Sequence, residues 1–592
     1  MLNDKNNILK GIAAAPGIAI SKAYMYTREQ EQISDIDIVD VEEAKQNLDE
    51  AFDRSRKELK KIFSLALDKL GERRAGIFEA QIMILDDPVL MQTLYSRIEQ
   101  EKKMPEYIVN DEITKYQEMM KSSDEPYMKE RSYDIADIKY RIIRNLKKKK
   151  WKSKITKDVV VVLESLTPAD TVLFSKASVN GYVTDFGGLT SHAAIIARSL
   201  NVPAVVGIHD ATRLINEDDL LIIDGFHGDV IVNPTKKQLK YYEEKVKRLS
   251  EYNKQLSELK NEPAITKDGK EIILMSNLDV TEEIEYIIQN GSKGIGLVRT
   301  EQIFEEYEEF PDEDTQYKVY SDLAEKIYPE KVIIRSFDIG GDKVLPVDIK
   351  EANPFLGWRG IRFLLDNREL FKNQLKAILR ASIHKNVSLM IPMISSIEEV
   401  RETKAILKEC KKELKERGVG FNKDLEFGIM VEVPSVAVMA KEYAQEVDFF
   451  SIGTNDLIQY VLAVDRGNEI VSDQYQEFHP AIIRTLSFII REGKLEDIFV
   501  SMCGEMAADP VAVPLLIGLG LDSLSVSASA IPAIKELIRS LYFKEVKNLA
   551  QECLTLKTEQ EVSGLLHAFF MKKAKGLYGM DFLLQREINP IK

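Results

Sequence analysis

The pattern of hydrophobic and polar positions divides the first 235 residues into a β-rich part that a helical part interrupts. Residues 8 to 24 alternate short apolar runs with a Pro16-Gly17 turn, which predicts strands that pair with segments further along the chain. From about residue 41 the chain is charged and poor in glycine, and apolar residues recur near helical spacing. Strand-like runs resume at residues 159–163, 220–224 and 228–232. We therefore expect an α/β domain formed by residues 1–40 and 149–235, with an inserted helical subdomain at residues 41–148.

A long amphipathic helix is predicted after Pro234. Apolar residues from position 239 to position 256 follow one another at alternating spacings of three and four, with Asn253 at one position of the seam. Glu262-Pro263 ends this segment. We interpret residues 236–264 as a linker helix that lets the preceding domain swing, although a plain surface helix has the same pattern.

The pattern changes in residues 265–592, where apolar, β-rich runs are separated or followed by helical stretches. Eight buried strands with intervening helices predict a (β/α)8 barrel, in which the chemistry lies just after the carboxyl end of each strand. The runs are residues 272–276, 294–298, 332–335, 389–393, 428–431, 449–452, 499–502 and 524–526.

Composition and charge exclude several functional classes. A formal net charge of −15 argues against a nucleic-acid-binding protein and permits a basic protein partner. No apolar run approaches the roughly 18 residues that span a bilayer, and the N-terminus lacks a signal-peptide core. We therefore expect a soluble, cytoplasmic protein without membrane insertion. The cysteines Cys410, Cys503 and Cys553 are too few and too scattered for a disulfide framework or a zinc site.

Residues 181 to 207 contain the first candidate reactive side chain. A β-branched and aromatic run breaks at Gly187-Gly188, and a Thr-Ser pair then precedes a segment rich in alanine and isoleucine. This order predicts a strand, a tight turn and a capped helix, with His192 in the first helical turn. Unpaired N–H groups and the helix dipole favour an anion there and disfavour a charged imidazole, so that a neutral ring nitrogen is available to attack phosphorus. The alternative is that His192 is only a polar helix cap.

Polar residues follow most strands of the predicted barrel. Arginine forks match phosphate and carboxylate oxygens two at a time, and Glu and Asp offer the oxygens that Mg²⁺ prefers. The pattern predicts a pocket for a small polyanion and a divalent metal, with ordinary salt bridges at the barrel rim as the alternative. The residues concerned are Arg299, Glu301, Arg335, Asp338, Arg359, Glu432, Asn455, Asp456, Arg466, Cys503 and Glu505.

The segment Gly-Gly-Leu-Thr-Ser-His-Ala-Ala-Ile-Ile-Ala-Arg, from Gly187 to Arg198, closely resembles the phosphohistidine signature of phosphoenolpyruvate-utilising enzymes. Nearly the whole chain resembles enzyme I of the sugar phosphotransferase system, the phosphoenolpyruvate-protein phosphotransferases. The resemblance implies a multidomain α/β protein: a swivelling phosphohistidine β/α domain with an inserted α-helical subdomain, followed by a C-terminal (β/α)8 TIM barrel. It also implies that the phosphoryl group of phosphoenolpyruvate passes to His192 and then to a histidine of the carrier protein HPr, with pyruvate as the other product.

The resemblance assigns roles to the charged residues of the barrel, and it implies Mg²⁺ as cofactor. Its implied substrate contacts are Arg299 and Arg335 on the phosphoryl group, Arg359 nearby, Arg466 as a clamp, and Asn455 and Asp456. Its implied Mg²⁺ ligands are Glu432 and Asp456. Cys503 resembles the family's proton donor to the enolate, whereas a lone cysteine in an apolar strand is usually inert core.

The resemblance further implies two protein partners, HPr and a second copy of the chain in a homodimer through the barrel. The inserted helices bind HPr in enzyme I, and residues 77–88 resemble part of that surface, although an apolar stripe of this kind is more often core. Arg131 is implied as a phosphate contact near His192. The chain departs from the family pattern at Gln81, Ser132, Tyr133, Gln302, Ile458, Val461 and Ala508, positions that bear on partner or substrate preference.

Two alternative functions share parts of this pattern. A pyruvate phosphate dikinase or phosphoenolpyruvate synthase carries an additional nucleotide-binding domain, and no glycine-rich nucleotide loop stands in the first 150 residues. A regulatory paralogue would bind phosphoenolpyruvate without turning it over, and the departures from the family pattern are the best support for this alternative.

Overall fold

The structure is a computed structural model of the chain. It describes residues 7–26, 33–121, 126–149, 158–165, 174, 179–188, 194, 197, 202–279, 281–303, 310–340, 351, 353–466, 468, 471 and 474–574. Two compact units divide in sequence between Arg248 and Leu249.

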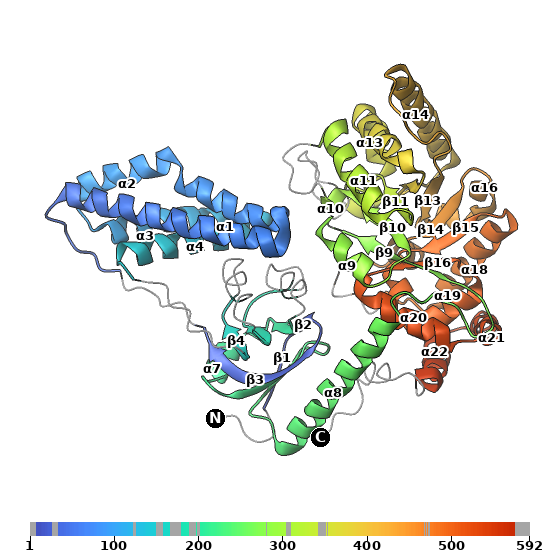
Figure 1. Cartoon of the computed structure of the whole chain (residues 1–592), viewed down its shortest axis with the longest axis horizontal. Helices are drawn as coiled ribbons and strands as arrows, with labels where there is room; N and C mark the ends of the chain where they lie inside the picture. Colours follow the sequence, from blue (N-terminus) through green and yellow to red (C-terminus); the bar gives the residue numbers. More distant parts are fainter. Residues whose placement is uncertain are drawn as a thin grey trace. The chain divides into compact units, whose positions relative to one another are not determined.

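The N-terminal unit contains a mixed eight-stranded sheet, of which Figure 1 labels β1 to β4. Its strand order is β1-β8-β7-β3-β4-β5-β6-β2. The run β3-β4-β5-β6 is parallel, and the other pairs are antiparallel. The predicted pairing of the first strands with later segments is confirmed, since Ile8 pairs with Ile231 and Ile12 with Val206. The strands are β1 (Ile8–Lys10), β2 (Ile12–Ala15), β3 (Ile18–Met25), β4 (Val159–Leu163), β5 (Gly181–Thr184), β6 (Ala204–Val206), β7 (Leu220–Asp224) and β8 (Asp229–Val232), with the short helix α7 (Ala211–Leu214) before β7.

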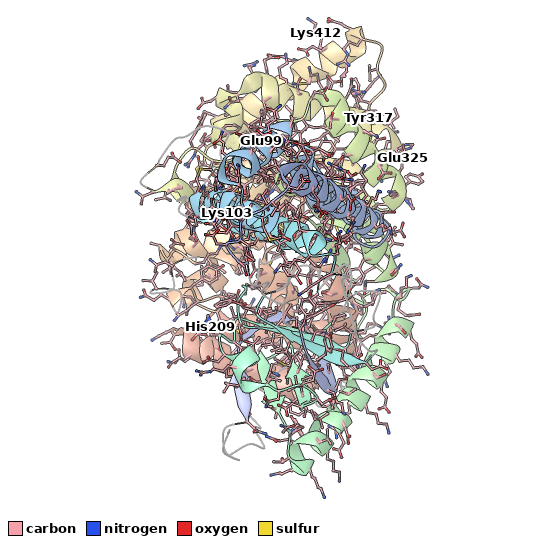
Figure 2. All side chains as sticks on the ribbon, turned by 90° about the vertical axis from the view of Figure 1, so that its left-hand side faces the viewer. Glu99, Lys103, His209, Tyr317, Glu325 and Lys412 are labelled. Carbon is pink, nitrogen blue, oxygen red and sulfur yellow. The ribbon has the colours of Figure 1, made fainter. Side chains whose placement is uncertain are left out.

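Among the described residues between β3 and β4 there are four helices, as the charged, glycine-poor pattern predicted. They are α1 (Val41–Leu85), α2 (Pro88–Glu101), α3 (Pro105–Lys121) and α4 (Pro126–Leu146). The Asp87 side chain accepts a hydrogen bond from the Val89 N–H and caps α2, and Pro88 occupies its first turn, where a missing N–H costs nothing. Lys103, labelled in Figure 2, lies in the α2–α3 connection. Its ion pairs at 2.7 Å with both Asp35 and Asp37 fasten the segment before α1 to this connection.

A buried ion pair fastens the first half of α8 (Lys236–Glu258) to the N-terminal sheet. Lys245 Nζ lies 3.0 Å from Asp224 Oδ2 at the end of β7, and both side chains are almost wholly buried. His227 Nδ1 lies 3.0 Å from the same oxygen. Burial alone would raise the pKa of Asp224, but the hydrogen bond from His227 and the charge of Lys245 outweigh it and lower the pKa to about 2.

The C-terminal unit is a closed barrel of eight parallel strands surrounded by helices, which confirms the predicted fold class (Figure 1). The strands are β9 (Ile273–Leu278), β10 (Gly294–Arg299), β11 (Lys331–Arg335), β12 (Val387–Ile391), β13 (Phe427–Val431), β14 (Phe449–Ile452), β15 (Phe499–Met502) and β16 (Ser523–Val526). The helices are α9 (Ile284–Gln289), α10 (Thr300–Ile303), α11 (Glu313–Ile327), α12 (Ile361–Asp366), α13 (Arg368–Ala381), α14 (Ile397–Glu416), α15 (Pro434–Val438), α16 (Ala440–Ala444), α17 (Thr454–Leu462), α18 (Pro480–Leu495), α19 (Val513–Leu519), α20 (Ile531–Ser540), α21 (Phe543–Cys553) and α22 (Glu559–Ala574).

The interior of the barrel is filled by a cluster of buried side chains. The cluster consists of Leu297, Ile333, Met390, Met430, Phe449 and Cys503. Because side chains alternate between the two faces of a strand, the residue two positions further on points into the same interior. Arg299, Arg335 and Glu432 stand at that position, so the alternation carries charged groups to the carboxyl ends of β10, β11 and β13.

In the part of the chain that the structure describes, no helix has both the length and the apolar composition needed to cross a membrane.

Candidate active site

Two buried arginines and two aspartates form a continuous network at the mouth of the barrel. Arg359 Nε and Nη2 donate to the two oxygens of Asp338 at 2.9 and 3.0 Å. The same guanidinium donates to the two oxygens of Asp456 at 3.2 and 3.0 Å. Arg335, from the end of β11, also lies 3.1 Å from Asp338. Asp338 therefore links two arginines that are 24 positions apart in sequence and brings them to one place.

Neighbouring carboxylates raise the pKa of both arginines by more than burial lowers it. Burial by itself would lower the pKa of Arg335 and of Arg359, and the charges of Glu301 and Asp338 on the first and of Asp338 on the second raise it instead. Arg335 Nη2 also donates to Glu301 Oε1, and the Arg335 and Glu301 side chains are each only 6% exposed. Both guanidinium groups are therefore fully charged and rigidly held, which is how an anion site is preorganised.

Glu432 lies beside this network with its carboxyl group buried. The Met393 N–H donates to Glu432 Oε1 at 2.6 Å, and Glu432 Oε2 lies against Gly453, where an added Cβ would be 3.0 Å away. Burial, followed by the charges of Asp456 and Asp338, raises the pKa of Glu432 to about 8, against the opposing charges of Arg359 and Arg335. The negative charges of Glu432 and Asp456 therefore repel one another, and a bound divalent cation would offset this repulsion.

Three more of the expected substrate contacts lie at the same mouth. Arg299, the last residue of β10, donates to Asp279 at 2.9 Å. Asn455 exchanges two hydrogen bonds with Glu505: Asn455 Nδ2 donates to Glu505 Oε1 at 3.0 Å, and the Glu505 N–H donates to Asn455 Oδ1 at 2.9 Å. Arg466 Nη1 lies 4.0 Å from Glu505 Oε1 and is the most exposed member of the expected set.

Cys503 follows β15 and faces the same interior as the arginines. Its side chain is buried, and burial raises the pKa of the thiol, against the nearby Ser451 hydroxyl and the charge of Arg335. Since the thiol keeps its proton at neutral pH, it is suited to donate a proton rather than to act as a standing nucleophile.

The expected nucleophile, His192, lies outside the described residues, as does the side chain of Arg131. The elements around His192 are described: β5 ends at Thr184, and Gly187 adopts a φ of 130°, a conformation that favours glycine. Ala194 and Ala197 are helical and buried against the sheet. A strand and a glycine turn thus precede the position of His192, in the order that the sequence predicted.

The segment that resembles an HPr-binding surface is mostly core on its described side chains. Phe78, Gln81 and Leu85 are at most 2% exposed, whereas Met83 is 69% exposed. The reading of this stripe as core therefore holds for these side chains, and the effect of Gln81 on partner preference stays a prediction. Ile458 is also buried, and Ala508 is half-buried. The side chains of Ser132, Tyr133 and Gln302 lie outside the described residues.

The sequence placed Glu301 and Asp338 in the predicted pocket without assigning them as partners of the arginines, and it did not single out Asp279. Asp338 stands three residues after Arg335, Glu301 stands two residues after Arg299, and Asp279 follows β9 by one residue. The available signal was their place after the strands β9, β10 and β11, where a barrel carries its chemistry.

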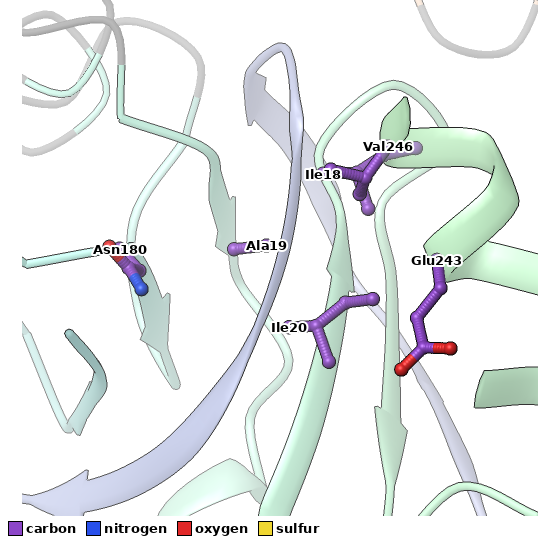
Figure 3. Close-up of a pocket in the computed structure, with 6 residues that line it drawn as sticks. All are labelled: Ile18, Ala19, Ile20, Asn180, Glu243 and Val246. Carbon is purple, nitrogen blue, oxygen red and sulfur yellow. The ribbon is translucent and has the colours of Figure 1, made fainter. Parts of the chain in front are cut away.

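A separate hollow of about 420 Å³ lies in the N-terminal unit between β3 and α8 (Figure 3). Its lining is mainly aliphatic, with the side chains of Asn180 and Glu243 at the edge. Asn180 already donates to Ser21 at 2.7 Å. This lining offers no cation to a phosphorylated substrate.

Profiles of three families match the chain in consecutive segments. "PEP-utilising enzyme, N-terminal" matches residues 10–131, "PEP-utilising enzyme, mobile domain" matches residues 155–228, and "PEP-utilising enzyme, PEP-binding domain" matches residues 253–543. The last segment contains the whole arginine and carboxylate network.

Similar proteins of known name cover nearly the whole chain. The phosphoenolpyruvate-protein phosphotransferase of Bacillus subtilis (strain 168) is 41% identical over 566 residues, which are 95% of this chain and 99% of the relative. That of Geobacillus stearothermophilus is 41% identical over 570 residues, 96% of this chain and 99% of the relative. A solution structure of an Enzyme I protein (nEIt) is 41% identical, covers 41% of this chain and 99% of its own, and has a TM-score of 0.37. The chain therefore belongs to the phosphoenolpyruvate-protein phosphotransferase family.

Proposed function

We propose that this protein transfers the phosphoryl group of phosphoenolpyruvate to His192 and then to a histidine of HPr, the first step of the sugar phosphotransferase system. The observation that carries the proposal is the network in which Asp338 joins Arg335 to Arg359, with Asp456 and Glu432 beside it. Charged donors held by buried carboxylates bind a small, highly charged substrate without having to rearrange.

Phosphoenolpyruvate is recognised by the arginines at the ends of β10 and β11 and by Arg359. The two strand-end arginines, Arg299 and Arg335, bind the phosphoryl oxygens, and Arg359 supports the same anion. Asn455 and Arg466 bind the remainder of the substrate, and both are already linked through Glu505. Arg466 is exposed, so it is the group that closes over the bound substrate.

Glu432 and Asp456 fit Mg²⁺. The raised pKa of Glu432 reflects two carboxyl groups in a buried site, an arrangement that a divalent cation stabilises. Asp456 accepts two hydrogen bonds from Arg359 and keeps further lone pairs for a metal. When bound, Mg²⁺ would offset the negative charge on the transferring phosphoryl group.

Phosphoryl transfer requires a neutral nitrogen of His192 in line with the phosphorus. The N–P bond forms as the P–O bond to the enolate breaks, and the arginines stabilise charge on the transferring group. The Cys503 thiol then protonates the enolate carbon, which gives pyruvate. Because one side chain must meet both phosphoenolpyruvate and HPr, the histidine domain moves between two positions, which suits a linker helix.

The partners we propose are HPr, bound on the helices α1 to α4, and a second copy of the chain, bound through the barrel. Met83 is an exposed apolar side chain on α1 that suits such an interface, in contrast to the buried Phe78 and Gln81.

Labelled phosphoenolpyruvate with Mg²⁺ tests the proposed function. We expect one acid-labile label per chain, its absence in His192→Ala, and its transfer to added HPr. A regulatory paralogue would bind phosphoenolpyruvate without acquiring the label, and an ATP-dependent enzyme of the dikinase type would release AMP; either result would overturn the proposal.

A further inference from the structure

A side chain on β9 holds the main chain of Cys503. In the barrel, β16 lies between β9 and β15. Asn277 Nδ2, near the end of β9, donates to the carbonyl oxygen of Cys503 at 3.2 Å. The ladder between β15 and β16 pairs Ser501 with Ser523 and Met502 with Leu524. Cys503 follows the last of these pairs, so the Asn277 amide takes the place of a backbone partner at this position.

The orientation of Asn277 is itself fixed by a second residue. Ser525 Oγ, on β16, donates to Asn277 Oδ1 at 2.7 Å, which turns the amide nitrogen toward Cys503. Ser525 is 1% exposed and packs on Gly296, where an added Cβ would lie 2.5 Å from its Oγ. The serine hydroxyl therefore has little room for another position.

The other contacts of Cys503 involve its N–H and its sulfur, so the hydrogen bond from Asn277 is the contact that holds its carbonyl oxygen. The Cys503 N–H donates to the Ile452 carbonyl at 3.1 Å, and Sγ lies 3.8 Å from the same oxygen. The amide end is thus tied to β14, and the sulfur makes only a weak contact. Without Asn277, the peptide between Cys503 and Gly504 would lose its side-chain anchor.

We propose that Asn277, oriented by Ser525, is a positioning residue that holds the Cys503 main chain so that Sγ delivers its proton to the enolate carbon. The proposal rests on the proposed function, in which Cys503 is the proton donor. In that step the S–H bond breaks, the π electrons of the enolate form the new C–H bond, and the pyruvate ketone forms. The thiolate then regains a proton from water.

Phosphoryl transfer and proton delivery can be measured as two separate rates. A positioning residue for Cys503 affects only the second rate, whereas a residue with a general structural role affects both. Rapid-quench experiments with labelled phosphoenolpyruvate and Mg²⁺ follow two rates in the whole protein: labelling of the protein and formation of pyruvate. We expect Ser525→Ala to label at the wild-type rate and to form pyruvate about tenfold more slowly, because a misplaced donor is an inefficient one. Its pyruvate formation should also show a larger solvent deuterium effect than that of the wild type.

Ser523→Ala is the matched control. Ser523 is a buried serine on the same strand and the same face, two positions earlier, and among the described residues its hydroxyl has no hydrogen-bond partner. We expect this variant to behave as the wild type in both rates. Equal pyruvate formation in Ser525→Ala and Ser523→Ala, with labelling intact, would overturn the positioning role alone. Absence of labelling in the wild type would instead refute the proposed function.

A second variant guards against misfolding of Ser525→Ala. Asn277→Ala should show the same delay in pyruvate formation, and adding Ser525→Ala to it should cost nothing further, because Ser525 acts only through Asn277. Additive losses in the double variant would contradict the chain of contacts from Ser525 through Asn277 to Cys503.

Discussion

Gly504 is the position at which a single methyl group should disable the barrel mouth. A Cβ added there would lie 1.9 Å from Thr454 Oγ1 and 2.7 Å from the Thr454 backbone nitrogen, whereas real Cβ contacts stay above 3.0 Å. Thr454 is fully buried at the start of α17, two residues before Asp456, and Gly504 follows Cys503. Rotation of the threonine side chain would relieve the first contact only, so the two backbones must move apart.

The size of the effect follows from that overlap. The backbone contact at 2.7 Å requires a shift of about 0.3 Å, and the contact with Oγ1 at 1.9 Å requires a shift of about 1 Å when the buried Thr454 side chain stays in place. Overpacking of this kind costs about 1–3 kcal/mol of stability. A misplacement of about 1 Å at a catalytic group can cost about a hundredfold in rate. We therefore expect Gly504→Ala to lower kcat/KM for phosphoenolpyruvate by about 10- to 100-fold, measured as pyruvate release coupled to lactate dehydrogenase.

Gly564→Ala is the matched control, since its added Cβ would meet no atom within 4 Å on the helix α22. An alanine within a helix is favoured over glycine by about 0.5–1 kcal/mol, so this variant should keep full activity and melt slightly higher. The φ of Gly504 is −72°, a value that any residue adopts, so strain is not the cause of the expected loss. A Gly504→Ala protein within twofold of wild-type activity would refute the argument that packing against Thr454 fixes Cys503 and Asp456.

Two further predictions concern the N-terminal unit and the metal site. Lys245→Met removes the buried cation beside Asp224 and should lower the free energy of unfolding at pH 7 by about 2 kcal/mol in urea. The pKa of Asp224, about 2, lies below its usual 3.8, so its stabilisation is complete above pH 4 and is lost as the pH falls toward 2; a wild-type–variant difference that stays constant over this range would contradict the pairing. Mg²⁺ at about one hundred times its dissociation constant should stabilise the wild type by about 2.7 kcal/mol and Glu432→Gln hardly at all, in thermal melts at pH 7. Equal stabilisation of both proteins would place the metal elsewhere.

The fold was predictable because each barrel strand is a short apolar run between helical segments. All eight expected runs coincide with strands of the barrel within a few residues, for example 332–335 with β11 (Lys331–Arg335). The paired halves of the N-terminal sheet were predictable for the same reason, since β4 is a run of buried β-branched residues. The motif around His192 also led to the family that the full-length relatives confirm.

Side-chain partnerships could not be predicted from spacing. The sequence indicated that Arg335 and Arg359 belong together, but only the three-dimensional arrangement gives Asp338 as the group that joins them. The sequence also could not predict which apolar residues of α1 are buried, because an apolar stripe on a helix has the same pattern whether it faces a core or a partner. Phe78 faces the core, and Met83, five residues later, faces outward.

The most direct test of the central claim is the label itself. With phosphoenolpyruvate labelled on phosphorus and with Mg²⁺, the wild-type protein should acquire one label that acid removes and that HPr accepts, while His192→Ala acquires none and still binds phosphoenolpyruvate. Stable labelling of His192→Ala, or a wild-type protein that binds phosphoenolpyruvate and never becomes labelled, would contradict the assignment of His192 as the carrier between the barrel and the partner protein.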